Sequence, residues 1–299
     1  MNGEPLIFVA GQPRSGTTLL QRILGGHPDV LTTSETWLLL HPLNAFREGF
    51  TADFDAGLAR QAATAFVRDH AGGAAVYWSA LGAAYELMYA AALEKAGKVR
   101  FLDKTPRYYD VLPELRKLFP AAHVVLMWRD PLAVLSSIYR TWCSEDPRTL
   151  GTYALDLTRA PEALLEGATS LGERCHVVRY EDLVLEPRVE LQGLCDKLGL
   201  SWTDGLQDYD GPRIDRFELG DQERVYQHTH PDRRLTTAWH DLLGDKQLWR
   251  FARDYLELLG EKTYEALGYD YEAAQRLLKQ HKPSGSLLRT LPLKRVLKK

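Results

Sequence analysis

A short glycine-bounded loop near the start of the chain constrains the fold more than any other feature. Residues 11–18 (GQPRSGTT) follow the apolar run 6–9 and precede the helical pattern 19–24. In a strand–loop–helix unit of this kind, backbone N–H groups and the positive end of the helix dipole point at one spot and favour an anion. The segment therefore predicts a phosphate-binding site within an α/β fold.

The position of the positive charge in this loop limits the kinds of phosphate ligand that the loop is expected to bind. A Walker A loop carries lysine directly after its second glycine, whereas this chain has Thr17 there and places its cation at Arg14. The loop resembles the 5′-phosphosulfate loop of sulfotransferases that use 3′-phosphoadenosine 5′-phosphosulfate (PAPS). This resemblance assigns Arg14, Ser15, Gly16, Thr17 and Thr18 to the nucleotide.

A second loop has the features of a partner phosphate site. Residues 123–128 (HVVLMW) read as a buried strand, and Arg129 follows directly, with Ser137 eight residues later in a helical pattern. This arrangement resembles the 3′-phosphate loop of the same family, in which the arginine and the serine would hydrogen-bond the phosphate. Each loop alone is a common feature of unrelated chains, but the pair matches a nucleotide with phosphates at two positions.

Further segments are similar to tyrosylprotein sulfotransferases and their bacterial relatives. They are residues 26–30 (GHPDV), 34–36 (SET), 102–106 (LDKTP) and 178–187 (VRYEDLVLEP). The resemblance implies that Glu35 is the general base and that Lys104 and Arg14 stabilise the leaving group. It also implies that Tyr180 contacts the nucleotide.

The same residues have simpler interpretations. Glu35 could decorate a helix start, and Lys104 could pair with Asp103 in a turn. The family match at both positions favours catalysis. His41 is an alternative base, whereas His27, which precedes a proline, is expected to be structural.

Two groups of residues complete the predicted site with less support. Further ligands of the 3′-phosphate are sought among four arginines: Arg216, Arg224, Arg233 and Arg234. Arg140 lies near, but not at, the spacing where tyrosylprotein sulfotransferases carry another nucleotide-binding arginine. Contacts to the acceptor are sought among side chains close in sequence to the catalytic segments: Trp37, His41, Tyr108 and Trp142.

The order of apolar runs predicts a mostly parallel sheet flanked by helices, which the resemblance identifies as the P-loop NTPase-like sulfotransferase fold. A strand and its loop are expected over 5–18, further strands near 99–102, 123–128 and 175–180, and helices within 18–95, 188–199 and 245–267. We expect a single sulfotransferase domain over residues 1–280, followed by a basic C-terminal tail over 281–299. Most aromatic residues of the alanine-rich segment 51–97 are expected in the core: Phe54, Phe66, Trp78, Tyr85 and Tyr89.

Composition excludes several classes of protein. A net charge of −3 gives no nucleic-acid signature. Three cysteines without a C-x-x-C pair suit a reducing compartment, so we expect a cytoplasmic protein. We also expect no transmembrane segment. No cluster with metal-ligand spacing is evident, and no metal is expected to be required. The last 21 residues hold seven Lys or Arg and no acidic residue. A solvated tail is favoured over a segment that makes weak contact with a membrane surface.

Together these features predict a PAPS-dependent sulfotransferase that acts on an acceptor hydroxyl. A carbohydrate or a small metabolite is favoured as acceptor, and protein tyrosine is a further candidate. The alternatives are an ATP-dependent P-loop kinase, which the missing lysine disfavours, and a nucleotide-binding protein without catalysis, which the combination of Glu35, Lys104 and Arg14 disfavours.

Overall fold

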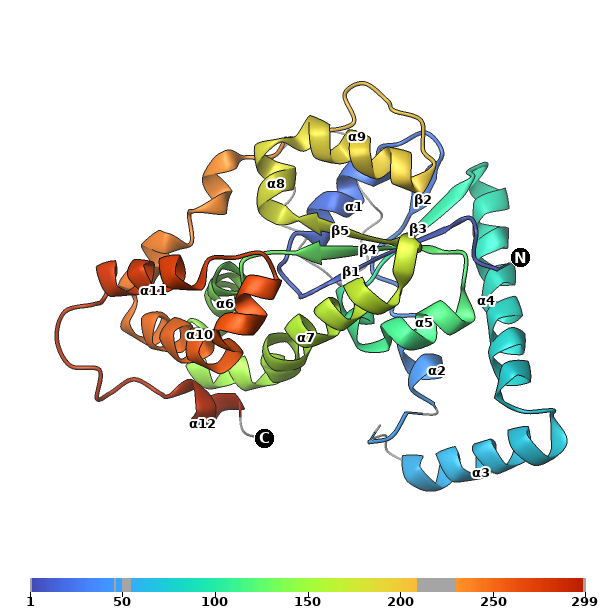
Figure 1. The fold of residues 1–299 in the computed structure, drawn as a ribbon, viewed down its shortest axis with the longest axis horizontal. Helices are drawn as coiled ribbons and strands as arrows, with labels where there is room; N and C mark the ends of the chain where they lie inside the picture. Colours follow the sequence, from blue (N-terminus) through green and yellow to red (C-terminus); the bar gives the residue numbers. More distant parts are fainter. Residues whose placement is uncertain (1, 46, 50–54, 209–229, 298–299) are drawn as a thin grey trace.

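A five-stranded parallel sheet lies at the centre of the molecule (Figure 1). The computed structural model describes residues 2–45, 47–49, 55–208 and 230–297. The strands, in the spatial order β2-β3-β1-β4-β5, are β1 (Leu6–Gly11), β2 (Val30–Thr32), β3 (Arg100–Lys104), β4 (His123–Trp128) and β5 (Cys175–Arg179). Because every pairing is parallel, the carboxyl ends of the strands meet at one edge, where α/β sheets bind ligands. The predicted α/β class is confirmed.

Helices cover both faces of this sheet and extend beyond its two sides (Figure 1). They are α1 (Thr17–Gly25), α2 (Leu40–Asn44), α3 (Ala56–His70), α4 (Ala74–Ala96), α5 (Leu112–Leu118), α6 (Pro131–Ile138), α7 (Ala154–Ser170), α8 (Tyr180–Leu185), α9 (Pro187–Leu198), α10 (Lys246–Ala266), α11 (Tyr271–Gln280) and α12 (Leu293–Leu297). The strand β2 interrupts the region expected to be helical, because three residues are too few to show a strand period.

The alternation of side chains along β1 divides the core into two layers. Phe8 packs with residues of α5 and α7 on one face, including Leu115 and Leu164. Ile7 and Val9 point to the other face, where they pack with α1, α8 and α9. All six residues of β1 are buried, as expected for a strand covered on both sides.

The helices α3 and α4 lie at one side of the molecule, away from the carboxyl edge of β4 and β5 (Figure 1). Tyr89 is buried against Phe8, and Trp78 and Tyr85 are partly buried. Phe66 is 61% exposed, so its expected core position is wrong. None of the residues of α3 is buried, because this helix packs on α4 and not on the sheet. Phe54 lies outside the described residues.

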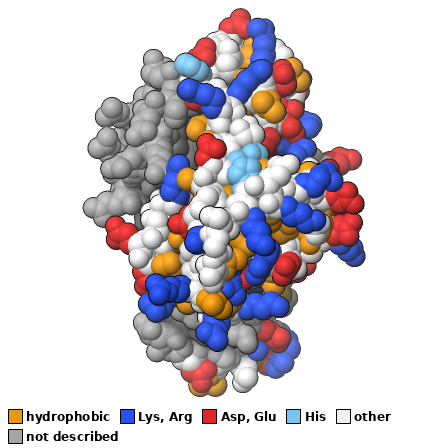
Figure 2. Space-filling view, turned by 90° about the vertical axis from the view of Figure 1, so that its left-hand side faces the viewer, with side chains coloured by type: hydrophobic (Ala, Val, Ile, Leu, Met, Phe, Trp, Pro, Cys, Tyr) orange, Lys and Arg blue, Asp and Glu red, His pale blue; other side chains and the backbone are white. Residues whose placement is uncertain are grey.

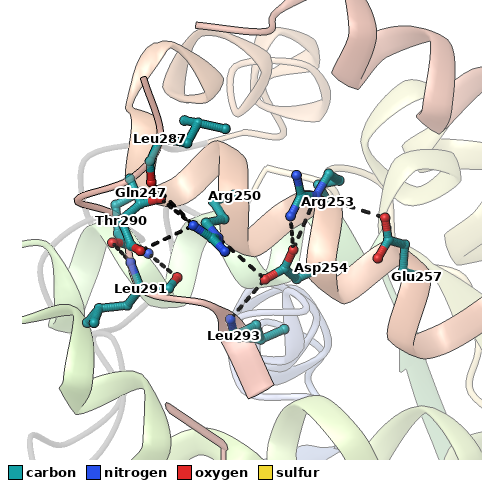
Figure 3. Close-up of polar contacts among 9 residues, drawn as sticks. All are labelled: Gln247, Arg250, Arg253, Asp254, Glu257, Leu287, Thr290, Leu291 and Leu293. Carbon is teal, nitrogen blue, oxygen red and sulfur yellow. Dashed lines mark hydrogen bonds and ion pairs between the residues drawn. The ribbon is translucent and has the colours of Figure 1, made fainter. Parts of the chain in front are cut away.

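The C-terminal segment is fastened to α10 (Figure 3). Arg250 donates to the carbonyl oxygens of Leu287 and Thr290, both at 3.3 Å, and the backbone N–H of Leu293 donates to Asp254 at 3.0 Å. The Leu293 side chain is fully buried in the cluster that α6, α10 and α11 form. The favoured interpretation of a solvated tail is therefore wrong for Leu293, which completes a core, whereas Leu288 is exposed as that interpretation expects.

The surface around this segment has no single sign of charge. Lys and Arg side chains are interspersed with Asp and Glu on the side of the molecule that lies at the left of Figure 1 (Figure 2). None of the described helices is long and apolar enough to span a membrane.

Candidate active site

The first phosphate loop joins β1 to α1 through two residues of positive φ. Arg14 has φ 75° and Gly16 has φ 98°, and α1 begins at the next residue, Thr17. A Cβ on Gly16 would lie 2.5 Å from Cδ2 of Tyr180, so only glycine fits beneath that ring. The hydroxyl of Ser15 is buried and has no partner within the described part of the chain. A phosphate oxygen would supply such a partner.

The second loop leaves β4 and turns into α6. Arg129 donates from Nη1 to the carbonyl oxygen of Arg14 at 3.0 Å, and its guanidinium lies 4.1 Å from the ring centroid of Tyr180. The Nε of Arg129 is buried and unpartnered among the described residues. Asp130 begins α6 by accepting the N–H of Leu132 at 2.8 Å.

The two loops meet at one contact between side chains. Arg14 Nε donates to Ser137 Oγ over 3.1 Å, although 123 residues separate the two in the chain. A π-helical turn, Tyr139–Cys143, follows α6 and brings Trp142 to 5.3 Å from the Arg14 guanidinium. Trp142 stacks in turn on Tyr153, with centroids 4.9 Å apart. One arginine therefore lies between the two predicted phosphate sites.

The proposed base and the proposed cation form a buried ion pair. Lys104 Nζ lies 2.6 Å from Glu35 Oε1 and 3.4 Å from the hydroxyl of Thr18 at the start of α1. The Lys104 side chain is 2% exposed and that of Glu35 is 10% exposed. The parallel sheet explains the meeting, because β3, which ends at Lys104, pairs with β2, which precedes Glu35, and with β1, which precedes Thr18.

Asp103 holds the segments on both sides of this ion pair. Its carboxylate accepts the hydroxyl of Thr36 at 2.8 Å and that of Thr105 at 3.2 Å, the residues next to Glu35 and Lys104. Burial raises the pKa of Asp103. Tyr108 donates to the same carboxylate at 3.1 Å and is fully buried, so its expected role in contacting the acceptor is wrong.

The comparisons with known proteins agree with this geometry. The profile of the sulfotransferase family matches residues 5–204, a span that holds both phosphate loops and the ion pair. The chain belongs to the sulfotransferase family.

Individual members show how far the similarity extends. Nodulation protein NoeE of Sinorhizobium fredii is 33% identical over 89% of this chain, which spans 66% of that protein. A putative protein-tyrosine sulfotransferase of Caenorhabditis briggsae is 26% identical, over 88% of this chain and 91% of the relative. Among solved structures, the sulfotransferase domain of the Synechococcus PCC 7002 olefin synthase superposes with a TM-score of 0.58 at 26% identity, over 90% of this chain and 96% of that domain. The sulfotransferase fold expected from the two loops is confirmed.

The weaker candidates for this sulfotransferase occupy varied positions. His41 is exposed on α2, and Arg140 is exposed within the π-helical turn. Arg233 donates to the carbonyl oxygen of Leu185 at 2.6 Å, while Arg234 pairs with Asp232. Both arginines thus have protein partners close at hand. Arg216 and Arg224 lie outside the described residues.

His27 is buried and bonded on both ring nitrogens. Its Nε2 lies 2.8 Å from the carbonyl oxygen of Ser201, and its Nδ1 accepts the N–H of Asp29 at 3.1 Å. The ring therefore carries its proton on Nε2. This pattern is that of a structural histidine, as expected.

Sequence reasoning missed a network behind the active site. Gln12 of the first loop donates to the backbone carbonyl of Asp156 at 2.8 Å, and the Asp156 carboxylate accepts two bonds from Arg107, at 3.0 and 2.8 Å. Tyr109 donates to the same carboxylate at 2.8 Å. Asp156 is buried on α7, a helix that the coarse sequence interpretation did not place, so no local pattern could have joined it to the loop.

Proposed function

We propose that this sulfotransferase transfers the sulfuryl group of PAPS to an acceptor hydroxyl. The observation that carries the proposal is the contact between Arg14 and Ser137, because it joins two phosphate loops into one site. A nucleotide with a 5′-phosphosulfate and a 3′-phosphate matches two such loops. A single nucleoside triphosphate chain would have no use for the second.

The residues present fit this donor. Ser15, Gly16, Thr17 and Thr18 surround the start of α1, where backbone N–H groups and the helix dipole favour the 5′-phosphate. The unpartnered Ser15 hydroxyl has room for a hydrogen bond there.

The 3′-phosphate is assigned to the second loop. Arg129 and Ser137 would hold it there, because the guanidinium can present two N–H donors and the Ser137 hydroxyl a third. Tyr180 would support this arrangement, since its ring fixes both Gly16 and the Arg129 guanidinium.

The chemistry follows from the ion pair. As the acceptor oxygen bonds to sulfur, Glu35 takes the proton of the acceptor hydroxyl. The bond between sulfur and the bridging phosphate oxygen breaks, and its electron pair stays on that oxygen. Lys104 and Arg14 stabilise the charge developing there. A sulfuryl group bears less negative charge than a phosphoryl group, so the proposal requires no metal ion. Lys104 Nζ contacts both Glu35 and Thr18, so the base and the cation act side by side.

For the acceptor, we favour a carbohydrate or a small hydroxylated metabolite. Half-buried Trp37 lies next to Glu35, and exposed Trp142 lies next to Arg14. Aromatic faces suit the apolar face of a sugar ring. Protein tyrosine is the second candidate, because several relatives are described as protein-tyrosine sulfotransferases. A cytoplasmic location is proposed as well, since Cys143, Cys175 and Cys195 are all free thiols.

A transfer assay with labelled PAPS tests the proposed function. The acceptors would be a panel of sugars, small alcohols and phenols, and a tyrosine peptide. We expect a labelled sulfate ester with a sugar or a small alcohol. Glu35→Gln should lower the rate by about 10²–10⁴-fold while leaving nucleotide binding intact. Exposed Glu94 supplies the matched control Glu94→Gln, with the wild-type rate. Full activity of Glu35→Gln would overturn the assignment of the base.

A further inference from the structure

We infer that Trp37 is a positioning residue for Glu35, an inference that rests on the proposed role of Glu35 as the base. The indole Nε1 of Trp37 donates to Glu35 Oε2 over 3.0 Å. The other oxygen, Oε1, faces Lys104 at 2.6 Å. The carboxylate is thus held at one oxygen by a neutral donor and at the other by a cation.

The chemistry of an indole suits this position. An indole N–H donates one hydrogen bond and accepts none, and it does not titrate with the carboxylate. It can therefore fix Oε2 without competing for the proton that Glu35 removes from the acceptor. Each carboxylate oxygen has two lone-pair directions, so both oxygens keep capacity for that proton after Trp37 and Lys104 are bound.

The backbone at Trp37 adds independent support. Its φ is 52°, in the left-handed region that bulky residues adopt rarely. Strain of this kind persists where surrounding contacts hold it, and it clusters at functional sites. Here the backbone N–H of Trp37 donates to Thr105 Oγ1 at 3.4 Å, and the adjoining Thr36 hydroxyl donates to Asp103.

The indole is also held by a second group. The Arg107 guanidinium lies 5.3 Å from the Trp37 ring centroid. This guanidinium donates two hydrogen bonds to the carboxylate of Asp156. The backbone carbonyl of Asp156 accepts from Gln12 in the first phosphate loop. The position of the base is therefore tied to the loop proposed to hold the donor.

Two substitutions of Trp37 separate the effect of the indole N–H on kcat from the effect of the aromatic ring. Trp37→Phe keeps an aromatic side chain and removes the donor, and it should lower kcat about 10–100-fold, the equivalent of one hydrogen bond to a charged group. The dissociation constant for adenosine 3′,5′-bisphosphate (PAP) and the KM for PAPS should stay within about twofold of wild type. Trp37→His restores a ring N–H and should recover part of the lost kcat. The acid limb of the kcat profile should move to higher pH in Trp37→Phe, a shift that a purely structural role would not produce.

The Glu35→Gln variant distinguishes the failure of this inference from the failure of the proposed function. If Glu35→Gln is inactive while Trp37→Phe retains wild-type kcat and the wild-type acid limb, the inference about Trp37 is wrong and the base stands. If Glu35→Gln is fully active, the proposed base itself is wrong, and the inference falls with it. When Trp37→Phe is added to Glu35→Gln, kcat should change by less than about twofold relative to Glu35→Gln alone, because the carboxylate that Trp37 positions is gone. PAP binding by every variant verifies that the site is folded.

Discussion

Arg14 Nε donates to Ser137 Oγ across 3.1 Å, so a residue of the first phosphate loop touches a residue of the second. Arg129 strengthens the same junction by donating to the Arg14 carbonyl oxygen. The two loops are consequently held in one relative position before any ligand contact is considered. A donor with phosphates at both loops would gain from this preorganisation.

The junction predicts that Arg14 and Ser137 act together in nucleotide binding. Arg14→Lys removes the planar fork and should weaken PAP binding about tenfold or more, and Ser137→Ala should weaken it as well. The double variant should lose less than the sum of the two, by about 0.5–3 kcal/mol, because the residues share one contact. Calorimetric titration of the four proteins measures this coupling. Strictly additive losses would show that the loops bind independently.

Gly16 should resist even a single added methyl group. A Cβ at this residue would meet the ring of Tyr180 at 2.5 Å, and its φ of 98° strains any other residue. Gly16→Ala should therefore lower stability and weaken PAP binding together. Gly172 is the matched control, since it also has a positive φ of 69° but nothing lies within 4 Å of its Cβ position. Urea unfolding should show that Gly172→Ala loses only the backbone contribution, about 1–2 kcal/mol. Equal losses in both variants would contradict the packing argument.

A buried histidine pair should make the protein sensitive to acid. Arg174 Nη1 lies 2.7 Å from His123 Nε2, and His123 Nδ1 lies 2.9 Å from His176 Nε2. A guanidinium only donates, so His123 must be neutral and accept at Nε2. Burial, followed by the charge of Arg174, lowers the pKa of His123 to about 4.

The direction of the pH effect follows from that lowered pKa. The unfolded chain binds the His123 proton more tightly than the folded protein does. The contribution of neutral His123 to stability is therefore full above about pH 6.5 and is lost as the pH falls towards 4. His123→Gln cannot titrate and should lose less stability over this window than wild type, by roughly 2–3 kcal/mol. Urea unfolding at intervals between pH 7 and pH 4 measures the difference. The same slope in both proteins would rule out this titration.

Docking of the C-terminal segment should contribute to stability. Leu293 is fully buried, and Leu293→Ala should cost about 2–5 kcal/mol. Leu288 lies in the same segment but is 92% exposed, so Leu288→Ala should change stability by less than about 0.5 kcal/mol. Thermal or urea unfolding of this leucine pair gives the comparison. Similar small effects from both would mean that the segment does not stabilise the domain.

The predictable parts of this molecule are those whose physical cause is local. The loop at residues 11–18 contains its own glycines and lies between an apolar strand and the start of a helix. The strand–loop–helix unit and the family of the protein could therefore be predicted from this segment. The roles of Glu35 and Lys104 were inferred from the resemblance, and the parallel pairing of β2 with β3 explains why the two residues lie close together.

Features that depend on distant contacts were not predictable. The Asp156 carbonyl reaches Gln12 only because α7 packs beneath the sheet, and Phe66 is exposed because α3 packs on another helix and not on the core. Tyr108 lies next to the catalytic segment in sequence, but its hydroxyl donates a hydrogen bond to the buried carboxylate of Asp103 and is therefore directed into the core. Helical periodicity in α3 shows which residues share a face and cannot show what that face meets.

Binding of PAP tests the central claim, that the two loops form one site for a nucleotide with two phosphates. Thermal unfolding would be followed with PAP and separately with ATP and Mg²⁺, on wild type, Arg129→Ala and the exposed control Arg276→Ala. At 100 times its dissociation constant, PAP should stabilise wild type and Arg276→Ala by about 2.7 kcal/mol, which is several degrees in Tm. Arg129→Ala should lose this shift. A shift with ATP and Mg²⁺ alone, or a PAP shift that survives in Arg129→Ala, would contradict the account.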